Sequence, residues 1–135
     1  RYTNGEVEGK IRGAQRFIDS AIYDRGMPAL LERIEKRKSQ PAEIQVLSIG
    51  NIDIAAFPAE YFVEFALRLK EAAYPRHALA VATANGMVGY VPTKEAFLRG
   101  GYETTFAASS RMAPEAGEIM LEEAIKLIKQ KKGEK

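Results

Sequence analysis

The chain has 135 residues, no cysteine and one histidine, and its 20 basic and 18 acidic residues leave a net charge of +2. This length suits one domain, and 46% hydrophobic with 28% charged residues is an ordinary globular composition that argues against disorder. A nucleic-acid partner usually requires a concentrated basic face, and the nearly balanced net charge does not imply one, so we expect no nucleic-acid partner. The lack of cysteine excludes disulfides, iron–sulfur clusters and thiolate zinc sites. No apolar run reaches the roughly 20 residues of a membrane-spanning helix.

The first third of the chain has the periodicity of helices, with apolar residues recurring at helical spacing from 11 to 22. Gly26 can end a helix, and Pro28 suits the first turn of the next. We therefore predict two helices, the second reaching about Lys38. The chain opens without a charged and then apolar leader, and we expect it to be a piece of a longer protein.

A β-hairpin is predicted next. Two apolar segments, 44–49 and 52–57, flank Gly50-Asn51, a dipeptide typical of tight hairpin turns. Pro58 ends the second segment. We expect two short strands that pair with each other.

A helix is predicted from Glu60 to Ala73, because apolar residues including Phe65 and Leu69 share one of its faces. Tyr74-Pro75 stops this helix. The continuous apolar run over 78–83 is typical of a buried strand.

Residues 84–112 are rich in loops, and long irregular segments in a compact chain are often functional. A short helix near 94–98 has Thr93 as its predicted N-cap. Pro114 opens a last helix, whose core face includes Met120 and Ile128. The alternation predicts an α/β (mixed α+β) fold, with a small mixed sheet of short strands flanked by amphipathic helices.

Two segments carry distinctive motifs. The first is IGNIDIAAFPAE at 49–60, and the second is ANGMVGYVPT at 84–93, followed by GGYE at 100–103. In this order and spacing they resemble the neutral/alkaline, non-lysosomal ceramidase family. The first is similar to the family's strand, turn, strand and Pro-Gly-Glu corner. The second is similar to its Gly-Tyr segment and downstream Tyr-Glu. The resemblance is clearest over 43–103 and corresponds to the C-terminal part of the family's catalytic domain.

The resemblance implies a catalytic zinc held by two histidines, a glutamate and a tyrosine. The family's glutamate lies in the Pro-Gly-Glu corner, which corresponds to Glu60, and its tyrosine lies in the Gly-Tyr segment, which corresponds to Tyr90. The two histidines lie far upstream in the family and have no counterpart in this chain. His77 stands at none of the matching positions. The chain thus carries half of a metal site, with no residue assigned to catalysis or substrate binding.

One position departs from the family, since the corner reads Pro58-Ala59-Glu60 instead of Pro-Gly-Glu. If the family's glycine needs a positive φ, alanine is strained there, and otherwise the change is harmless. Tyr102 and Glu103 match a family segment, but we can assign them no role.

Without the resemblance, the same residues have ordinary structural explanations. Glu60 would be a carboxylate in the first turn of a helix, which the helix dipole favours. Tyr90 would be an aromatic residue packed beside a turn, and His77 a surface or loop histidine.

Two dipeptides in the loop region are first of all turn formers, Asn85-Gly86 and Gly100-Gly101, with lining of the site mouth as the functional alternative. Ser109-Ser110 lacks the glycines of a nucleophile elbow, so we expect no serine hydrolase site there.

The resemblance implies a zinc-dependent amidohydrolase, which hydrolyses the N-acyl amide bond of ceramide or a related lipid with a zinc-activated water. Residues 1–135 would be a single domain or a fragment within its larger layered catalytic domain. The missing ligands would come from the N-terminal remainder of that domain or from another subunit, and the chain alone would be inactive. If family behaviour holds, the protein is secreted or membrane-associated.

The alternative is a non-catalytic α/β interaction module, or a subunit that lacks a complete metal site. The absence of both histidine ligands favours this hypothesis. The presence of both the Glu60 and the Tyr90 motifs argues against it.

Overall fold

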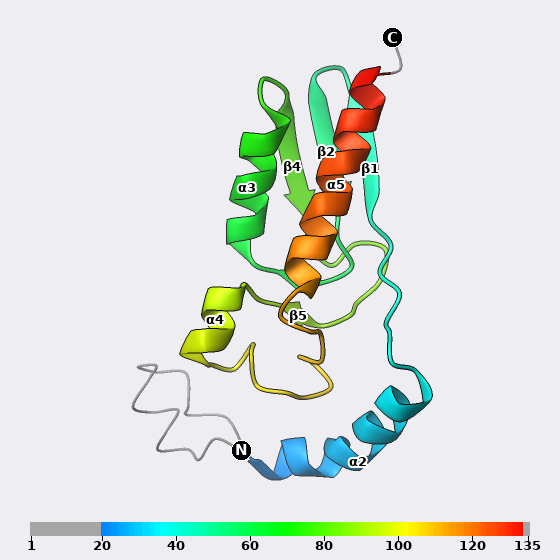
Figure 1. Ribbon diagram of the computed structural model, residues 1–135, viewed down its shortest axis with the longest axis vertical. Coiled ribbons are helices and arrows are strands. Elements are labelled where there is room, and N and C mark those ends of the chain that lie inside the picture. The colour runs from blue at the N-terminus through cyan, green and yellow to red at the C-terminus, as the bar shows by residue number, and fades with distance from the viewer. Residues whose placement is uncertain (1–19, 134–135) are drawn as a thin grey trace.

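The structure is a computed structural model, and it describes residues 20–133. Along the chain these form α2 (Ser20–Lys36), β1 (Gln45–Ile49), β2 (Ile52–Ala56), β3 (Glu60–Tyr61), α3 (Val63–Ala73), β4 (His77–Val81), β5 (Tyr90–Val91), α4 (Lys94–Arg99) and α5 (Ala116–Gly133) (Figure 1). None of these helices is long and apolar enough to cross a membrane.

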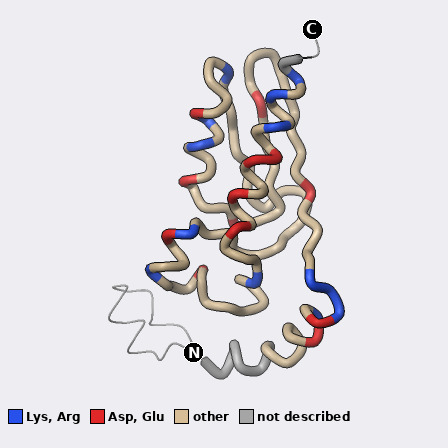
Figure 2. The backbone as a smooth tube through the Cα atoms, viewed as in Figure 1, with Lys and Arg blue, Asp and Glu red and all other residues tan. Residues whose placement is uncertain are grey.

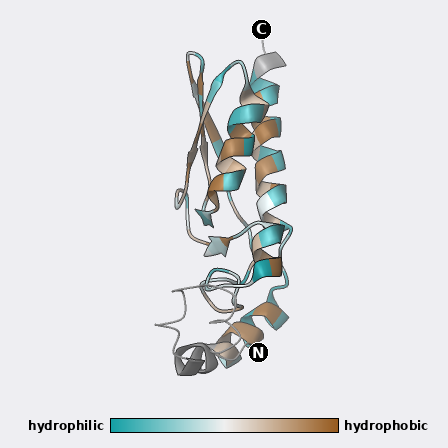
Figure 3. Ribbon diagram, turned by 90° about the vertical axis from the view of Figure 1, so that its left-hand side faces the viewer, coloured by the Kyte–Doolittle hydropathy of each residue, from teal (hydrophilic) through white to brown (hydrophobic). Residues whose placement is uncertain are grey.

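The main layer is a three-stranded sheet in the order β1-β2-β4. Strand β1 pairs with β2 antiparallel, and β2 pairs with β4 parallel through the crossover helix α3. Helices α3 and α5 cover one face of this sheet (Figure 3). Strands β3 and β5 form a separate parallel pair. The predicted mixed α+β fold, with a small mixed sheet and flanking helices, is confirmed.

The predicted hairpin is also confirmed. Ile49 and Ile52 are opposite one another in the β1–β2 register, and Gly50 in the turn has φ of 58°, which glycine adopts without strain. On the helix-facing side, the Asp53 carboxylate is only 1% exposed. It accepts hydrogen bonds from the Ser48 hydroxyl at 2.6 Å and from Arg76 at 2.7 and 2.9 Å. A buried charge is tolerated when it is paired and hydrogen-bonded in this way.

An aromatic stack connects the layers. The ring of Tyr61 stacks between Phe57 and Phe65, with centroid distances of 4.3 and 4.6 Å. The Tyr61 hydroxyl donates a 2.6 Å hydrogen bond to the carbonyl of Gly117 at the start of α5. Burial, with the nearby charge of Glu118 as the second cause, raises the pKa of Tyr61 well above its ordinary value. The stack therefore joins the residue just after β2 to β3, α3 and α5.

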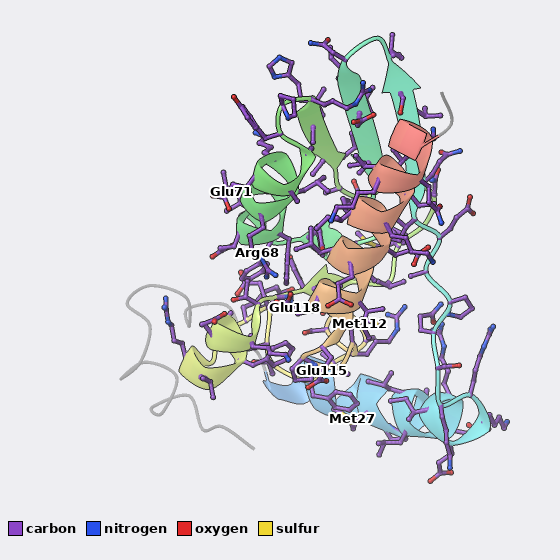
Figure 4. The ribbon with its side chains drawn as sticks, turned by 45° about the horizontal axis from the view of Figure 1, so that its top comes forward. Met27, Arg68, Glu71, Met112, Glu115 and Glu118 are labelled. Atoms are coloured by element: carbon purple, nitrogen blue, oxygen red, sulfur yellow. The ribbon has the colours of Figure 1, made fainter. Side chains whose placement is uncertain are left out.

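Helices α3 and α5 are also joined at the surface. The Arg68 guanidinium donates two hydrogen bonds of 2.7 Å to the two carboxylate oxygens of Glu118 (Figure 4). This fork-to-fork geometry adds directional specificity to the pair, although its solvent exposure limits its contribution to stability.

The predicted break in the first third is wrong. Helix α2 continues through Gly26 and Pro28 to Lys36. The φ that proline imposes is already helical, so Pro28 removes one hydrogen-bond donor without forcing the chain to turn. The part of the predicted helix before residue 20 lies outside the described residues.

Two other predicted boundaries are wrong. Helix α3 begins at Val63, because Glu60 and Tyr61 belong to β3. Their backbone pairs with β5, where Glu60 N–H donates to the Gly89 carbonyl and Phe62 N–H to that of Val91. Strand β4 ends at Val81 and is buried on one face only. The short helix α4 and its cap are confirmed, since Thr93 Oγ1 accepts a hydrogen bond from Ala96 N–H.

The sheet face opposite the helices is apolar and lies in water. Alternation along the strands and the pairing register place nine residues on it: Gln45, Leu47, Ile49, Ile52, Ile54, Ala56, His77, Leu79 and Val81. Leu47 is 52% exposed and Ile49 67% exposed. The charged residues follow the helices and leave the strands nearly free of them (Figure 2). No element of the described part of the chain covers this face.

The replacement of Gly117 by alanine tests the contact between α3 and α5. A Cβ atom there would lie 2.2 Å from Cζ of the fully buried Phe65. Overpacking of this kind costs about 1–3 kcal/mol, which exceeds the gain of up to ~1 kcal/mol from alanine's helix preference. We expect urea denaturation to show a net loss of stability.

Gln130→Ala, on the exposed side of α5, is the matched control and should leave stability within about 0.5 kcal/mol. Equal stability of Gly117→Ala and the native chain would show that α3 and α5 do not approach each other as described.

Candidate functional site

An open cavity of about 550 Å³ adjoins the β3–β5 pair and brings together the two residues that the sequence motifs single out. Glu60 and Tyr90 are direct partners in the register of the two strands, although 30 positions separate them in the chain. Both line the cavity and both are half-buried. The remaining wall includes Thr83 and Glu103. A carboxylate and a phenol therefore face the same space.

Backbone hydrogen bonds hold the corner that carries Glu60. Thr83 N–H donates to the Ala59 carbonyl at 2.9 Å, and Val88 N–H donates to that of Pro58 at 2.7 Å. Ala59 is fully buried, and its φ is not in the left-handed region. The corner thus accepts alanine without backbone strain, which answers the question raised by the missing glycine.

Gly89 is the residue that lets Tyr90 approach the neighbouring loop. Its φ is +98°, and a Cβ atom there would lie 2.3 Å from the carbonyl oxygen of Ser109. That carbonyl accepts a 2.8 Å hydrogen bond from Tyr90 N–H. Any side chain at position 89 would push Ser109 away and break the bond that positions Tyr90.

The electrostatics of the cavity centre on the Tyr90 hydroxyl and its cross-strand neighbour Glu60. Hydrogen bonding to Glu60 is the largest cause that raises the pKa of Tyr90 to about 12, and burial and the charge of Glu60 add to it. At neutral pH the phenol therefore keeps its proton. Only a cation that replaces this proton could make both oxygens anionic ligands.

Tyr102 and Glu103, which had no assigned role, belong to the same site. The Tyr102 ring contacts the Tyr90 ring edge to face, with a centroid distance of 5.6 Å. Glu103 lines the cavity, and its charge adds to the rise in the pKa of Tyr90. The hydroxyl of Ser110 donates to the Glu103 carbonyl, which fixes this loop beside the site. In the sequence, only their position in the GGYE motif indicated that Tyr102 and Glu103 could belong to the site.

The two turn-forming dipeptides lie outside the cavity wall. Asn85 has φ of 62°, and its side-chain amide donates to Gln45 on β1 at 3.3 Å, so the Asn85-Gly86 turn is directed toward the sheet. Gly100 lines a neighbouring cavity, near Arg68 and Glu118.

His77 cannot complete a metal site at Glu60. It begins β4, whereas the cavity adjoins the residues just after the opposite end of that strand. A five-residue strand is about 17 Å long. Among the side chains that the structure describes, those of residues 27–131, no three of histidine, cysteine, aspartate or glutamate form a group that could hold a metal ion. The described residues thus supply a pair of oxygen donors and no imidazole.

No protein-family model, curated protein or solved structure matches the chain. The resemblance to ceramidases therefore rests on the motifs alone.

Replacement of Glu60 by glutamine should lower the pKa of Tyr90 from about 12 toward its ordinary value of 10.0, because the negative acceptor is removed. The readout is the pH titration of the tyrosinate absorbance band, with the Tyr90→Phe protein subtracted to isolate this residue. In the native chain the folded state holds the phenol proton to higher pH than the unfolded chain. The resulting stabilisation is complete below pH 10 and is lost as pH rises toward 12.

Glu71→Gln, an exposed change on α3, is the control and should leave the titration of Tyr90 unchanged. An unchanged Tyr90 titration in Glu60→Gln would show that the two side chains are not hydrogen-bonded.

Proposed function

We propose that the chain forms part of a zinc-dependent amidohydrolase that cleaves an N-acyl amide bond, with ceramide or a related lipid as the substrate class. The observation that carries the proposal is the cross-strand pairing of Glu60 and Tyr90 at one open cavity. These are the two positions at which the ceramidase-like motifs place zinc ligands. Sequence motifs and spatial pairing are separate lines of support, because 30 residues separate the two positions.

The donor set fits two positions of a tetrahedral zinc site. Zinc accepts carboxylate oxygens, and a catalytic site keeps one position for water or substrate. Loss of the phenol proton on metal binding would turn Tyr90 into a second anionic ligand. The two imidazoles that the resemblance implies have to come from outside this chain, as His77 is at the wrong end of β4.

When bound, zinc would supply an activated water and polarise the amide carbonyl. The residues of this chain would hold and surround the reacting groups. Glu60 and Tyr90 are fixed by backbone bonds on both sides, so little rearrangement is needed for them to act together. Phe62 and Val63 on the cavity wall offer apolar contact to the acyl chain of a lipid.

The second candidate is a non-catalytic interaction module, and the exposed apolar sheet face favours it. Parallel strands are usually covered on both faces, whereas here Leu79 and Val81 on the parallel strand β4 are 48% and 42% exposed. A partner layer on this face would bury them. The two candidates differ at Glu60 and Tyr90, because a pure interaction module has no need for a metal-binding pair.

Zinc binding to the chain distinguishes the two candidates. We expect calorimetry in imidazole buffer, which offers the missing nitrogen ligands, to detect one zinc per chain. Glu60→Gln and Tyr90→Phe should each weaken binding by at least about tenfold, since each removes a metal ligand. Glu71→Gln and Tyr74→Phe are the matched controls at exposed positions and should bind zinc like the native chain.

Hydrolysis is tested in a longer gene product that carries the histidines. There the same two variants should lose amide hydrolysis of a short-chain ceramide together with bound zinc. Full zinc content and full hydrolysis in both variants would refute the proposal and leave the interaction module.

A further inference from the structure

A second cavity, of about 400 Å³, lies between α2 and the start of α5 and shares no residue with the cavity at Glu60 and Tyr90. Its wall combines two kinds of side chain. One kind is apolar and comes from both helices and the segment before α5, namely Leu30, Ile34, Met112 and Ile119. The other kind is cationic, namely Arg33, Arg37, Lys38 and Arg111. Met112 and Glu115 mark the α5 side of this cavity (Figure 4).

Arg111 is the centre of the cationic part. Its Nε atom is buried and has no hydrogen-bond partner within the described structure. One of its terminal nitrogens donates to the Ala108 carbonyl. Burial lowers the pKa of Arg111, and the positive charge of Arg33 lowers it further, so the two guanidinium groups act on each other across the cavity.

These cations have little compensation within the described residues. Arg33 donates to the neutral side chain of Gln40 at 3.2 Å. No ion pair found among the side chains of residues 27–131 joins Arg33, Arg37 or Arg111 to a carboxylate. Among the described residues of the cavity wall Glu115 is the one acidic residue, and it is exposed. Positive charges that lie close together without paired carboxylates repel one another, and an anion in the cavity would offset that repulsion.

The shape and composition of the wall define the anion. Guanidinium groups present parallel N–H donors that match the two oxygens of a carboxylate. The apolar remainder of the wall offers no hydrogen bonds to a small hydrated anion, but it can pack against a hydrocarbon chain. Small-molecule sites are typically of this kind, mostly apolar with a few polar groups that fix orientation, and this volume is within their usual range.

We propose that this cavity binds an aliphatic carboxylic acid, with the carboxylate on Arg111 and Arg33 and the chain along the apolar wall. Met112 lets the wall adapt to chains of different length, since methionine has an unbranched and flexible side chain. The inference does not depend on the zinc site, because no residue is common to the two cavities. If the chain does serve an amide hydrolase, the acid released by that reaction belongs to the class that this cavity would take.

The test is calorimetric titration of the full 135-residue chain with octanoate, kept below its micelle-forming concentration. We expect one saturable site. Arg111→Gln should weaken binding by at least about tenfold, because a charged hydrogen-bond donor to the carboxylate is lost, and Arg33→Gln should weaken it as well. Arg99→Gln is the matched control, since Arg99 is exposed at the end of α4 and lies outside this cavity. Its affinity should equal that of the native chain.

A ligand series on the native chain tests the same proposal without any variant, which matters if Arg111→Gln fails to fold in circular dichroism. Octanoate should bind more tightly than acetate, inorganic phosphate or octan-1-ol. Equal affinity for octan-1-ol would show that the arginines do not bind the carboxylate. Equal or tighter binding of phosphate would make this a small-anion site. Full octanoate affinity in both arginine variants would place the ligand elsewhere, for example on the exposed sheet face. Each of these results, or no binding at all, overturns the proposal.

Discussion

The structure depends on the position of the Tyr61 ring. It stacks between Phe57, just after β2, and Phe65 in α3, and its hydroxyl bonds to the backbone of α5 at Gly117. Gly117 has to lack a side chain, because Phe65 occupies the space in which a Cβ atom would lie. Tyr61 is the strand neighbour of Glu60, so the contacts that fix its ring also fix the backbone that carries Glu60 beside the cavity. The packing of the core and the position of Glu60, the candidate metal ligand, thus depend on the same contacts.

Local patterns were enough to predict part of the fold. The hairpin, α4 with its Thr93 cap, and the core-facing side of α5 follow from turn chemistry and periodicity, which operate over a few residues. The β3–β5 pair could not be predicted in this way. Each of its strands has two residues, which is too short for any periodicity, and long-range backbone bonds define the pair. The same bonds explain why α3 starts at Val63 and not at Glu60, since they hold Glu60 in an extended conformation.

The candidate site was only partly accessible from the sequence. The motifs singled out Glu60 and Tyr90, and their proximity is a property of the fold that no local pattern contains. Their role as zinc ligands stays a prediction. The contact of Tyr102 with Tyr90 depends on the path of a loop, and motif position alone assigned it no role. The arginine-lined cavity joins residues from α2 and from the segment before α5, which are some 80 positions apart in the chain. In the sequence these arginines look like ordinary surface charges, and no motif connects them.

The exposed sheet face has a thermodynamic consequence. Residues such as Ile49 are already in contact with water in the folded chain, so unfolding exposes less new apolar surface than it would in a fully covered sheet. The heat-capacity change of unfolding is set by that surface, so it should fall below the usual value of about 12–15 cal/mol/K per residue. The stability curve of the isolated chain is then flatter with temperature than its length suggests. A partner that covers the face would bind with a negative heat-capacity change. The stability curve of the complex would then be more strongly curved with temperature than that of the isolated chain.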